Sequence, residues 1–363
     1  MRIGYSFWGF LGEGITDTPD GGRSHRRSLL DGLLAAGHDL VLLQRNRDLA
    51  EAGADLRHRY HWDETGVPDL DALVLEWRWP IAGRNTTPCG TGGHTCDLHR
   101  QHQLVSHYTD QGLPTIVWDK DRQLPHDDVL RTHPAVSVCE AALYPSPGAH
   151  SLLFPVDDAD LDDADPAELS RGERTVPLVY VGNQYNRDDA FDTFFAPAAA
   201  QHDHRVAGKW TETARWPHVH FTGRIPYPAV AELYREALAT VLLLPPRYAA
   251  AGQMTQRLFE AVLAGCLPLA PTTIRGIERY VPTALHVDDG PAVTRRISQL
   301  RQCSPDQRAE LLAACLRQLD VFRLSRQITT LDTLLPNVPA ASGSPDTVTV
   351  DHDNEGGRTC TRS

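Results

Sequence analysis

Short apolar segments alternate with amphipathic segments along this chain. The alternation occurs in two blocks, separated by an acidic stretch at 154–177. In the first half we expect strands at 2–6, 39–43, 72–75 and 114–118, with helices at 23–36 and 97–111. Beyond the acidic stretch the same rhythm restarts at 178–182. Repeated strand–helix units with short apolar strands predict parallel sheets covered by helices. The fold class we predict is therefore α/β, with two such units.

The length of 363 residues exceeds what one hydrophobic core usually organises, which also favours two domains. The polar, proline-bearing composition of the acidic stretch suits an interdomain connection. We expect the following parts: an N-terminal Rossmann-like domain (1–157), an acidic linker (158–176), a C-terminal Rossmann-like domain (177–315), a helix (316–335) and a disordered tail rich in Pro, Ser, Thr, Gly and Asp (336–363).

The charge balance restricts the partners of the protein. Asp and Glu number 47 against 35 Lys and Arg, which gives a net charge of −12. An acidic surface repels a phosphate backbone, so we expect no double-stranded nucleic acid partner. The sequence contains no apolar run of membrane-spanning length and does not begin with a signal-peptide pattern. We therefore predict a cytoplasmic protein without integral membrane association.

The seven cysteines are scattered and contain no C-x-x-C pair, which argues against a disulfide framework or a zinc ribbon. One segment brings Cys89, His94, Cys96 and His99 together. Their spacing departs from the usual zinc patterns, so we predict no metal site. No G-x-G-x-x-G fingerprint occurs, which disfavours a dinucleotide cofactor.

The segment 248–270 carries the most specific functional signal. It predicts a loop, a helix at 256–264 and a buried strand. On that helix Leu258, Phe259, Val262 and Leu263 form one apolar stripe, whereas the opposite face carries Arg257, Glu260 and two alanines. Such a sparsely charged face suits a closely approaching ligand, and a helix N-terminus attracts anions. We interpret the helix as the holder of a nucleotide-sugar donor.

Three further residues belong to this predicted donor site. Lys209 and Arg247 follow strands expected at 204–208 and 240–245, where open α/β sheets place their ligands. Together with Arg257 they are the cations expected to face a diphosphate. Thr255 either caps the helix or contacts phosphate.

The first half offers candidate residues for the opposite wall. Gly22 lets the backbone approach a ligand at the start of a helix, and His25 in its first turn is a candidate base for an inverting reaction. Glu76 and Asp119 lie just past apolar runs, so either is a candidate to deprotonate an acceptor hydroxyl or orient the sugar. The alternative for both carboxylates is that they cap neighbouring segments.

The order of motifs in the second half resembles that of GT-B-fold glycosyltransferases, particularly the group 1 and spore-maturation-type branch. The segments that carry the resemblance are LVYVGN (178–183), VAGKW (206–210), HFTGRIPYPAVAELYREA (220–237), TVLLLPPR (240–247), TQRLFEAVLAGCLPLA (255–270) and LYPSPGAHSLLFPVDD (143–158). The resemblance implies two facing Rossmann-like domains, of which the N-terminal one (1–157) binds the acceptor and the C-terminal one (177–315) binds the donor. It also implies an interdomain cleft and a C-terminal helix (316–335) that crosses back. It also implies metal-independent transfer of a sugar from a nucleotide-diphosphate sugar to an acceptor hydroxyl, with no other cofactor.

Within this resemblance, Glu260 matches the glutamate that accepts hydrogen bonds from the ribose of the donor. Retaining members often have a second glutamate eight positions earlier, where this chain has Gly252. That departure leaves the stereochemistry of the reaction open. The nucleotide base, the sugar and the acceptor are also open.

Two alternative functions fit the same double-Rossmann plan. One is a nucleotide-sugar epimerase, which would need acid–base residues on both sides of the sugar. The other is a non-catalytic protein that binds a nucleotide or sugar, an option that Gly252 encourages. Hydrolysis of nucleotide sugars, with and without acceptor, would separate these possibilities from a glycosyltransferase.

Overall fold

The computed structural model describes residues 1–12, 22–82, 85–88, 91–92 and 96–335. The predicted tail (336–363) and two residues of the cysteine–histidine segment, Cys89 and His94, lie outside the described residues. The predictions made for them stay predictions.

The first sheet is parallel throughout, and its described strands lie in the order β3-β2-β1-β4-β5-β6-β7. The strands are β1 (Arg2–Ser6), β2 (Asp39–Leu42), β3 (His61–Trp62), β4 (Ala72–Glu76), β5 (Thr115–Asp119), β6 (Val136–Glu140) and β7 (His150–Ser151). The helices of this half are α1 (Arg23–Ala35), α2 (Arg47–Ala52) and α3 (Asp97–Asp110).

Both faces of the first sheet are buried, which explains why its strands are continuously apolar. In β2, Leu40 and Leu42 pack in the same cluster as Leu29 and Leu33 of α1. Val41, between them, points to the other face, where it belongs to the cluster that contains residues of α3.

The second sheet is also parallel, with the described strand order β10-β9-β8-β11-β12-β13. Its strands are β8 (Val176–Val181), β9 (His204–Ala207), β10 (Phe221–Gly223), β11 (Ala237–Val241), β12 (Leu267–Pro271) and β13 (His286–Val287). The helices that follow in the chain are α6 (Asp188–Ala190), α7 (Ala196–Ala199), α8 (Tyr227–Glu236), α9 (Pro246–Ala251), α10 (Arg257–Leu263), α11 (Gly290–Leu300), α12 (Pro305–Gln318) and α13 (Leu324–Leu334).

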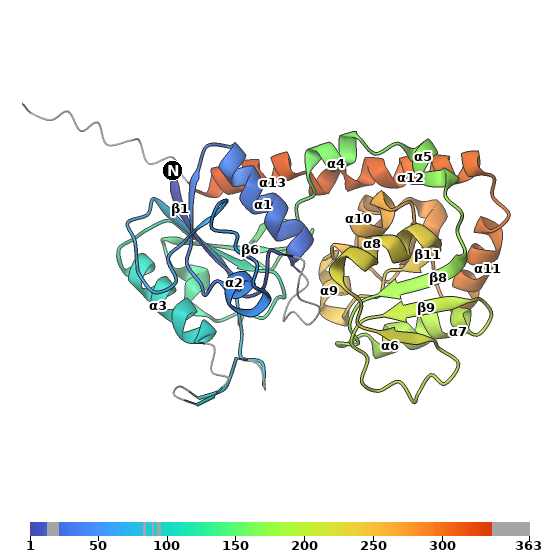
Figure 1. Cartoon of the computed structure of the whole chain (residues 1–363), viewed down its shortest axis with the longest axis horizontal. Helices are drawn as coiled ribbons and strands as arrows, with labels where there is room; N and C mark the ends of the chain where they lie inside the picture. Colours follow the sequence, from blue (N-terminus) through green and yellow to red (C-terminus); the bar gives the residue numbers. More distant parts are fainter. Residues whose placement is uncertain (13–21, 83–84, 89–90, 93–95, 336–363) are drawn as a thin grey trace, which may run out of the picture.

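When the strands of each sheet are numbered along the chain, both sheets begin with the spatial order 3-2-1-4. This is the doubly wound order of Rossmann folds. Figure 1 shows the two halves side by side. The predicted α/β class with two Rossmann-like units is confirmed. In open parallel sheets, ligands bind at the carboxyl ends of the strands, so these ends are where a site is expected.

Several element boundaries differ from those expected. The helical segment that begins at α6 contains a π-helical turn at Phe191–Phe195, in which Phe191 and Phe195 stack on each other inside the core. The strand expected at 240–245 begins three residues earlier, at Ala237, directly after α8. The stretch before α10, expected to be a loop, contains the short helix α9.

The acidic linker is not an open loop, because it forms α4 (Asp158–Asp162) and α5 (Pro166–Arg171). The helix expected at 316–335 is not continuous, because the chain breaks between α12 and α13. At the break, Val156 donates to the carbonyl of Phe322, and Leu324 donates to the carbonyl of Val156, both at 2.8 Å. The segment leaving the first half thus pairs with the segment returning to it.

Helix α13 lies beside α1 of the first half (Figure 1), and the side chain of Leu324 fills the space above Gly32. The Leu153 backbone N–H also donates to the side-chain oxygen of Gln327 on α13, at 2.9 Å. The predicted return of the C-terminal helix to the first half is therefore present.

Two glycines offer a matched stability test. Gly252 ends α9 with a φ of 59°, and Gly53 ends α2 with a φ of 68°. A Cβ at position 252 would lie 2.6 Å from the carbonyl oxygen of Arg275, whereas one at position 53 meets nothing within 4 Å. The clash also explains why no larger residue fits at 252.

We expect Gly53→Ala to lower the free energy of unfolding by about 1 kcal/mol, because only the left-handed backbone is penalised. Gly252→Ala should lower the free energy of unfolding by about 1–3 kcal/mol more than Gly53→Ala, because the Arg275 carbonyl must also move. Denaturant unfolding of both variants measures the difference. Equal losses would show that the contact with Arg275 relaxes at no cost.

Candidate functional site

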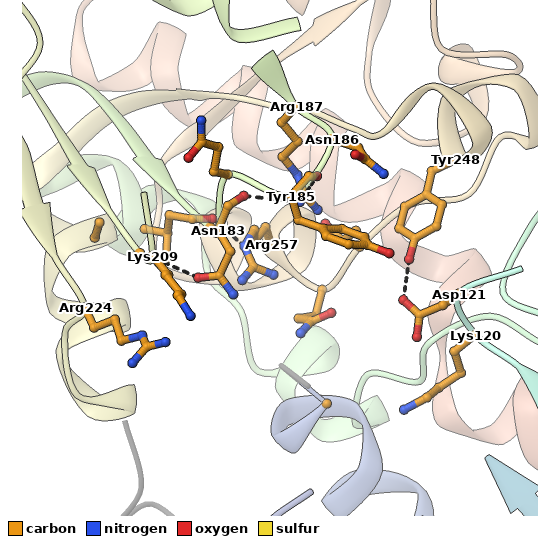
Figure 2. Close-up of a pocket in the computed structure, with 18 of the residues that line it drawn as sticks. Lys120, Asp121, Asn183, Tyr185, Asn186, Arg187, Lys209, Arg224, Tyr248 and Arg257 are labelled. Atoms are coloured by element: carbon orange, nitrogen blue, oxygen red, sulfur yellow. Dashed lines mark hydrogen bonds between the residues drawn. The ribbon is translucent and has the colours of Figure 1, made fainter. Parts of the chain in front are cut away.

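A cavity of about 840 Å³ lies between the two halves at the carboxyl ends of their strands. The second half lines it with residues that follow β8, β9 and β10 and with α10, whereas the first half contributes the start of α1 and the loops after β4 and β5. Figure 2 shows Lys209, Arg224 and Arg257 on one side of this space and Lys120 and Asp121 on the other.

Helix α10 presents Arg257 and Glu260 to the cavity, as predicted. The Arg257 Nε donates to the carbonyl of Val181, and Glu260 Oε1 accepts a hydrogen bond of 2.9 Å from Ser24 Oγ of α1. Burial raises the pKa of Glu260, although Arg257 and Ser24 act in the opposite direction. The two alanines expected on the same face, Ala261 and Ala264, instead pack in the core.

Thr255 lines the cavity and is buried. The residue that caps α10 is Gln256, and no side chain donates or accepts a capping bond there. The capping alternative for Thr255 is therefore wrong, whereas its contact with phosphate stays a prediction.

Lys209 lies on the cavity wall after β9, with an exposed side chain. Its backbone N–H donates to Asn183 Oδ1 at 2.9 Å, which joins the loops that follow β8 and β9 (Figure 2). Gly208 allows this approach: a Cβ there would lie 2.1 Å from the carbonyl oxygen of Gly182. Arg224, which was not among the predicted donor-site residues, follows β10 on the same wall.

Arg247 is not among the described residues that line the cavity. It lies on α9, and its Nε donates to the backbone carbonyl of Asp121 at 3.0 Å. Its guanidinium also lies over the rings of Tyr185 and Tyr248. Because these contacts engage the side chain between the two halves, the geometry does not support its predicted role at the diphosphate.

Glu76 lies at the end of β4 but is sealed from solvent. Its carboxylate accepts hydrogen bonds from Arg26 Nη2 at 2.6 Å and Lys120 Nζ at 2.5 Å, and from Arg78 Nη2 at 3.2 Å and the Tyr5 hydroxyl at 2.9 Å. Burial opposes its ionisation, but the three cations outweigh burial and hold the pKa of Glu76 well below its ordinary value. A group so bound cannot take a proton from an acceptor, so its predicted catalytic role is wrong on this geometry.

Asp119 is also fully buried. Its carboxylate accepts the backbone N–H groups of Gln123 and Leu124 at 2.9 and 2.8 Å. It therefore shapes the loop after β5, which is the capping alternative rather than the predicted catalytic role. Burial raises the pKa of Asp119, and these two backbone bonds partly offset that effect.

The carboxylate that this loop presents to the cavity is Asp121, two residues further on. It accepts a hydrogen bond from the Tyr248 hydroxyl of the second half (Figure 2). The sequence signal that could have pointed to Asp121 is the motif WDKD, which contains two aspartates. The conformation of the loop decides which of the two faces the cavity.

Gly22 and His25 both line the cavity at the start of α1. Gly22 caps this helix with an ordinary negative φ, and a Cβ there would lie 2.8 Å from Arg26 Nη2. The His25 ring packs against Phe154 and Trp118, with centroid distances of 4.3 and 5.6 Å. Both roles stay predictions.

In the described part of the chain, no group of three or more His, Cys, Asp or Glu residues is arranged to hold a metal ion. Within the same residues, no helix combines the length and apolar character that crossing a membrane requires.

Residues 187–331 match a family model described as glycosyl transferase-like. No curated protein matches the sequence. Among solved structures, T4 phage BGT in complex with its UDP-glucose substrate has 14% identity and a TM-score of 0.61, covering 92% of this chain and 99% of that one. Sucrose-phosphate synthase from Thermosynechococcus elongatus has 12% identity and a TM-score of 0.56, covering 92% and 98%.

A third structure, AviGT4, a glycosyltransferase involved in avilamycin A biosynthesis, has 14% identity and a TM-score of 0.54, covering 92% of this chain and 98% of that one. At these identities the similarities define the fold, which is the GT-B fold of two Rossmann-like halves. The match at 187–331 supports glycosyl transfer as the class of activity, and the chain as a whole has the GT-B fold. This finding favours a transferase over the epimerase and the non-catalytic alternative, whereas the spore-maturation-type branch stays a prediction.

Proposed function

We propose that the protein transfers a sugar from a nucleotide-diphosphate sugar to an acceptor hydroxyl. The observation that carries this proposal is the shared cavity between the two halves, where Glu260, Arg257 and Lys209 lie on one wall. In the reaction, the acceptor oxygen forms a bond to the anomeric carbon, and the bond from that carbon to the diphosphate breaks.

The second half would bind the donor. Glu260 offers a carboxylate that accepts hydrogen bonds from two vicinal ribose hydroxyls. Lys209, Arg224 and Arg257 would neutralise the charge that develops on the leaving diphosphate. Their position beside the carboxyl ends of β8, β9 and β10 supports this assignment, because open α/β sheets bind ligands there.

The first half would bind and activate the acceptor. If the configuration of the sugar inverts, a base must take the hydroxyl proton. Asp121 and His25 are the described lining residues of this half that suit the role. NMR analysis of the anomer first released on hydrolysis of the donor would show whether the reaction inverts.

Metal independence is part of the proposal, since three cationic side chains on the donor wall can stabilise the diphosphate directly. One solved relative is T4 phage BGT with UDP and Mn²⁺, so the point needs a test. Turnover that survives EDTA and does not rise with added Mn²⁺ or Mg²⁺ would support it.

The acceptor we propose is not duplex DNA. One solved structure with this fold is the DNA-modifying enzyme β-glucosyltransferase, but the present chain carries a net charge of −12. That charge disfavours binding to a phosphate backbone.

A binding and hydrolysis panel tests the donor assignment. We expect one of UDP, GDP or dTDP to bind in calorimetry, and its glucose conjugate to be hydrolysed slowly without acceptor. Lys209→Gln should weaken the diphosphate about tenfold, because one charge-assisted contact is lost, and should leave the parent nucleoside unaffected.

Arg301→Gln is the control, because Arg301 is an exposed cation at the end of α11 that does not line the cavity. It should bind the diphosphate like the unmodified protein. Failure of every nucleoside diphosphate to bind would refute the donor assignment.

A further inference from the structure

A second cavity, of about 220 Å³, lies in the first half at the carboxyl ends of β1, β2 and β4. The chain runs from β1 to β2 on one side and returns to β4 on the other, so the cavity sits where the strand order reverses. Such switch points are the usual ligand-binding positions of parallel sheets.

Two buried side chains of this cavity have unused hydrogen-bonding groups. Gln44 is 6% exposed, and neither its amide oxygen nor its amide nitrogen has a partner among the described residues. Trp8 is 4% exposed, and its indole N–H is likewise unpartnered within the described chain. Because buried polar groups are almost always hydrogen-bonded in native proteins, these groups point to a ligand.

Hydrogen bonds fix the side chain of Gln101, which also lines the cavity. The Gln101 amide accepts from the backbone N–H of Arg78 at 2.7 Å and donates to the Arg78 carbonyl at 2.8 Å. The Arg47 and Arg78 guanidinium groups both lie 5.8 Å from the centre of the Trp8 ring. Since its ring is engaged by two cations, Trp8 offers a ligand its N–H edge rather than a face for stacking.

The unused groups define the chemistry of the ligand. A primary amide supplies two donors and one acceptor, and the indole supplies one donor. Both are uncharged. Of the charged residues that also line the cavity, Arg100 and Asp97 are bonded within the protein, and the exposed Arg45 and Glu64 have opposite charges, so the lining favours neither sign of ligand. Hydroxyl groups, which both donate and accept, match this set.

We propose that this cavity binds a neutral, hydroxyl-bearing sugar ring that forms part of the acceptor. Arg78 lines both this cavity and the cleft between the halves, so a ring held by Gln44 and Trp8 borders the donor site. The acceptor would then be an extended molecule with one unit at Gln44 and its reactive hydroxyl at the cleft. This inference rests on the proposed transferase function.

Saturation-transfer NMR with the methyl glycosides of glucose, galactose and mannose tests the proposal on the full chain. We expect at least one glycoside to bind the unmodified protein, and its affinity to fall at least tenfold in Gln44→Leu. Trp8→Phe, which keeps an aromatic ring but lacks the N–H, should weaken the same glycoside. Gln299→Leu, at an exposed position of α11, should bind it normally.

Nucleoside diphosphate binding, measured on the same samples, separates the two proposals and reports folding. If Gln44→Leu binds the nucleotide normally and loses the glycoside, the inference holds. If nucleotides bind but no glycoside does, or if Gln44→Leu binds the glycoside unchanged, the second site is refuted and the transferase proposal stands. Binding of nucleosides but not glycosides at Gln44 would overturn the sugar assignment.

Discussion

Glu76→Ala is expected to lower the free energy of unfolding by about 3–5 kcal/mol, the range for breaking a buried ion pair by removing one partner. The carboxylate lies within 3.2 Å of nitrogen atoms of Arg26, Arg78 and Lys120, and its side chain has 0% exposure. Its removal leaves three buried cations without this anion. Denaturant unfolding at neutral pH measures the loss.

The effect should depend on pH in a defined direction. The pKa of Glu76 is lowered in the folded protein, because its three cations outweigh the effect of burial. A lowered pKa stabilises the fold above the unfolded value of about 4.3, and this stabilisation disappears as the pH falls further. The difference between the unmodified protein and Glu76→Ala should therefore shrink below about pH 4.

Glu236→Ala is the matched control, since Glu236 pairs with Arg205 at 2.8 Å but its side chain is 50% exposed. Exposed ion pairs contribute about 0–1 kcal/mol, so this variant should unfold almost like the unmodified protein. Equal losses for the two variants would show that the cluster around Glu76 is not an essential part of the fold.

Glu260→Ala is expected to weaken binding of the donor nucleotide about 100-fold. The variant loses two hydrogen bonds to a charged group, each worth about 1.5–3 kcal/mol, and new hydrogen bonds to water offset part of this loss. Calorimetry with the nucleotide sugar selected by the panel measures the loss. The 2′,3′-dideoxy analogue of that nucleotide should bind both proteins equally, because it lacks the ribose hydroxyls.

The affinity for the donor should also fall on acidification. Burial raises the pKa of Glu260, and only its carboxylate form accepts bonds from both hydroxyls. Binding is therefore expected to weaken as the pH decreases through this raised value, and Glu260→Ala should not show this dependence. Glu236→Ala again serves as control, and unchanged affinity in Glu260→Ala would remove Glu260 from the donor site.

The parts of the site that depend on local sequence were predictable. Helix α10 lies within one residue of its expected range, and Arg257 and Glu260, three residues apart, point to the same space. The spacing of apolar residues along one helix determines this face. The position of Lys209 was also predictable. It follows a parallel strand directly, and the carboxyl ends of such strands lie at one edge of the sheet.

The parts that depend on distant partners were not predictable. Strand-end position places Glu76 and Asp119 at the correct edge of the sheet but does not reveal whether they are accessible. Glu76 is sealed by Arg26, which lies 50 positions away in the chain, and by Lys120, which lies 44 away. Asp121 replaces Asp119 at the cavity only because of the path of one loop.

The polypeptide passes between the two halves of the molecule at Val156 and again at Arg323, and two backbone bonds fasten these passages to each other. The halves also contact each other away from these passages, because Asp121 bonds to Arg247 and Tyr248, and Ser24 bonds to Glu260. A rotation of the halves about Val156 and Arg323 when substrate arrives would therefore have to break these bonds, with atoms travelling farther the more remote they are from the two passages.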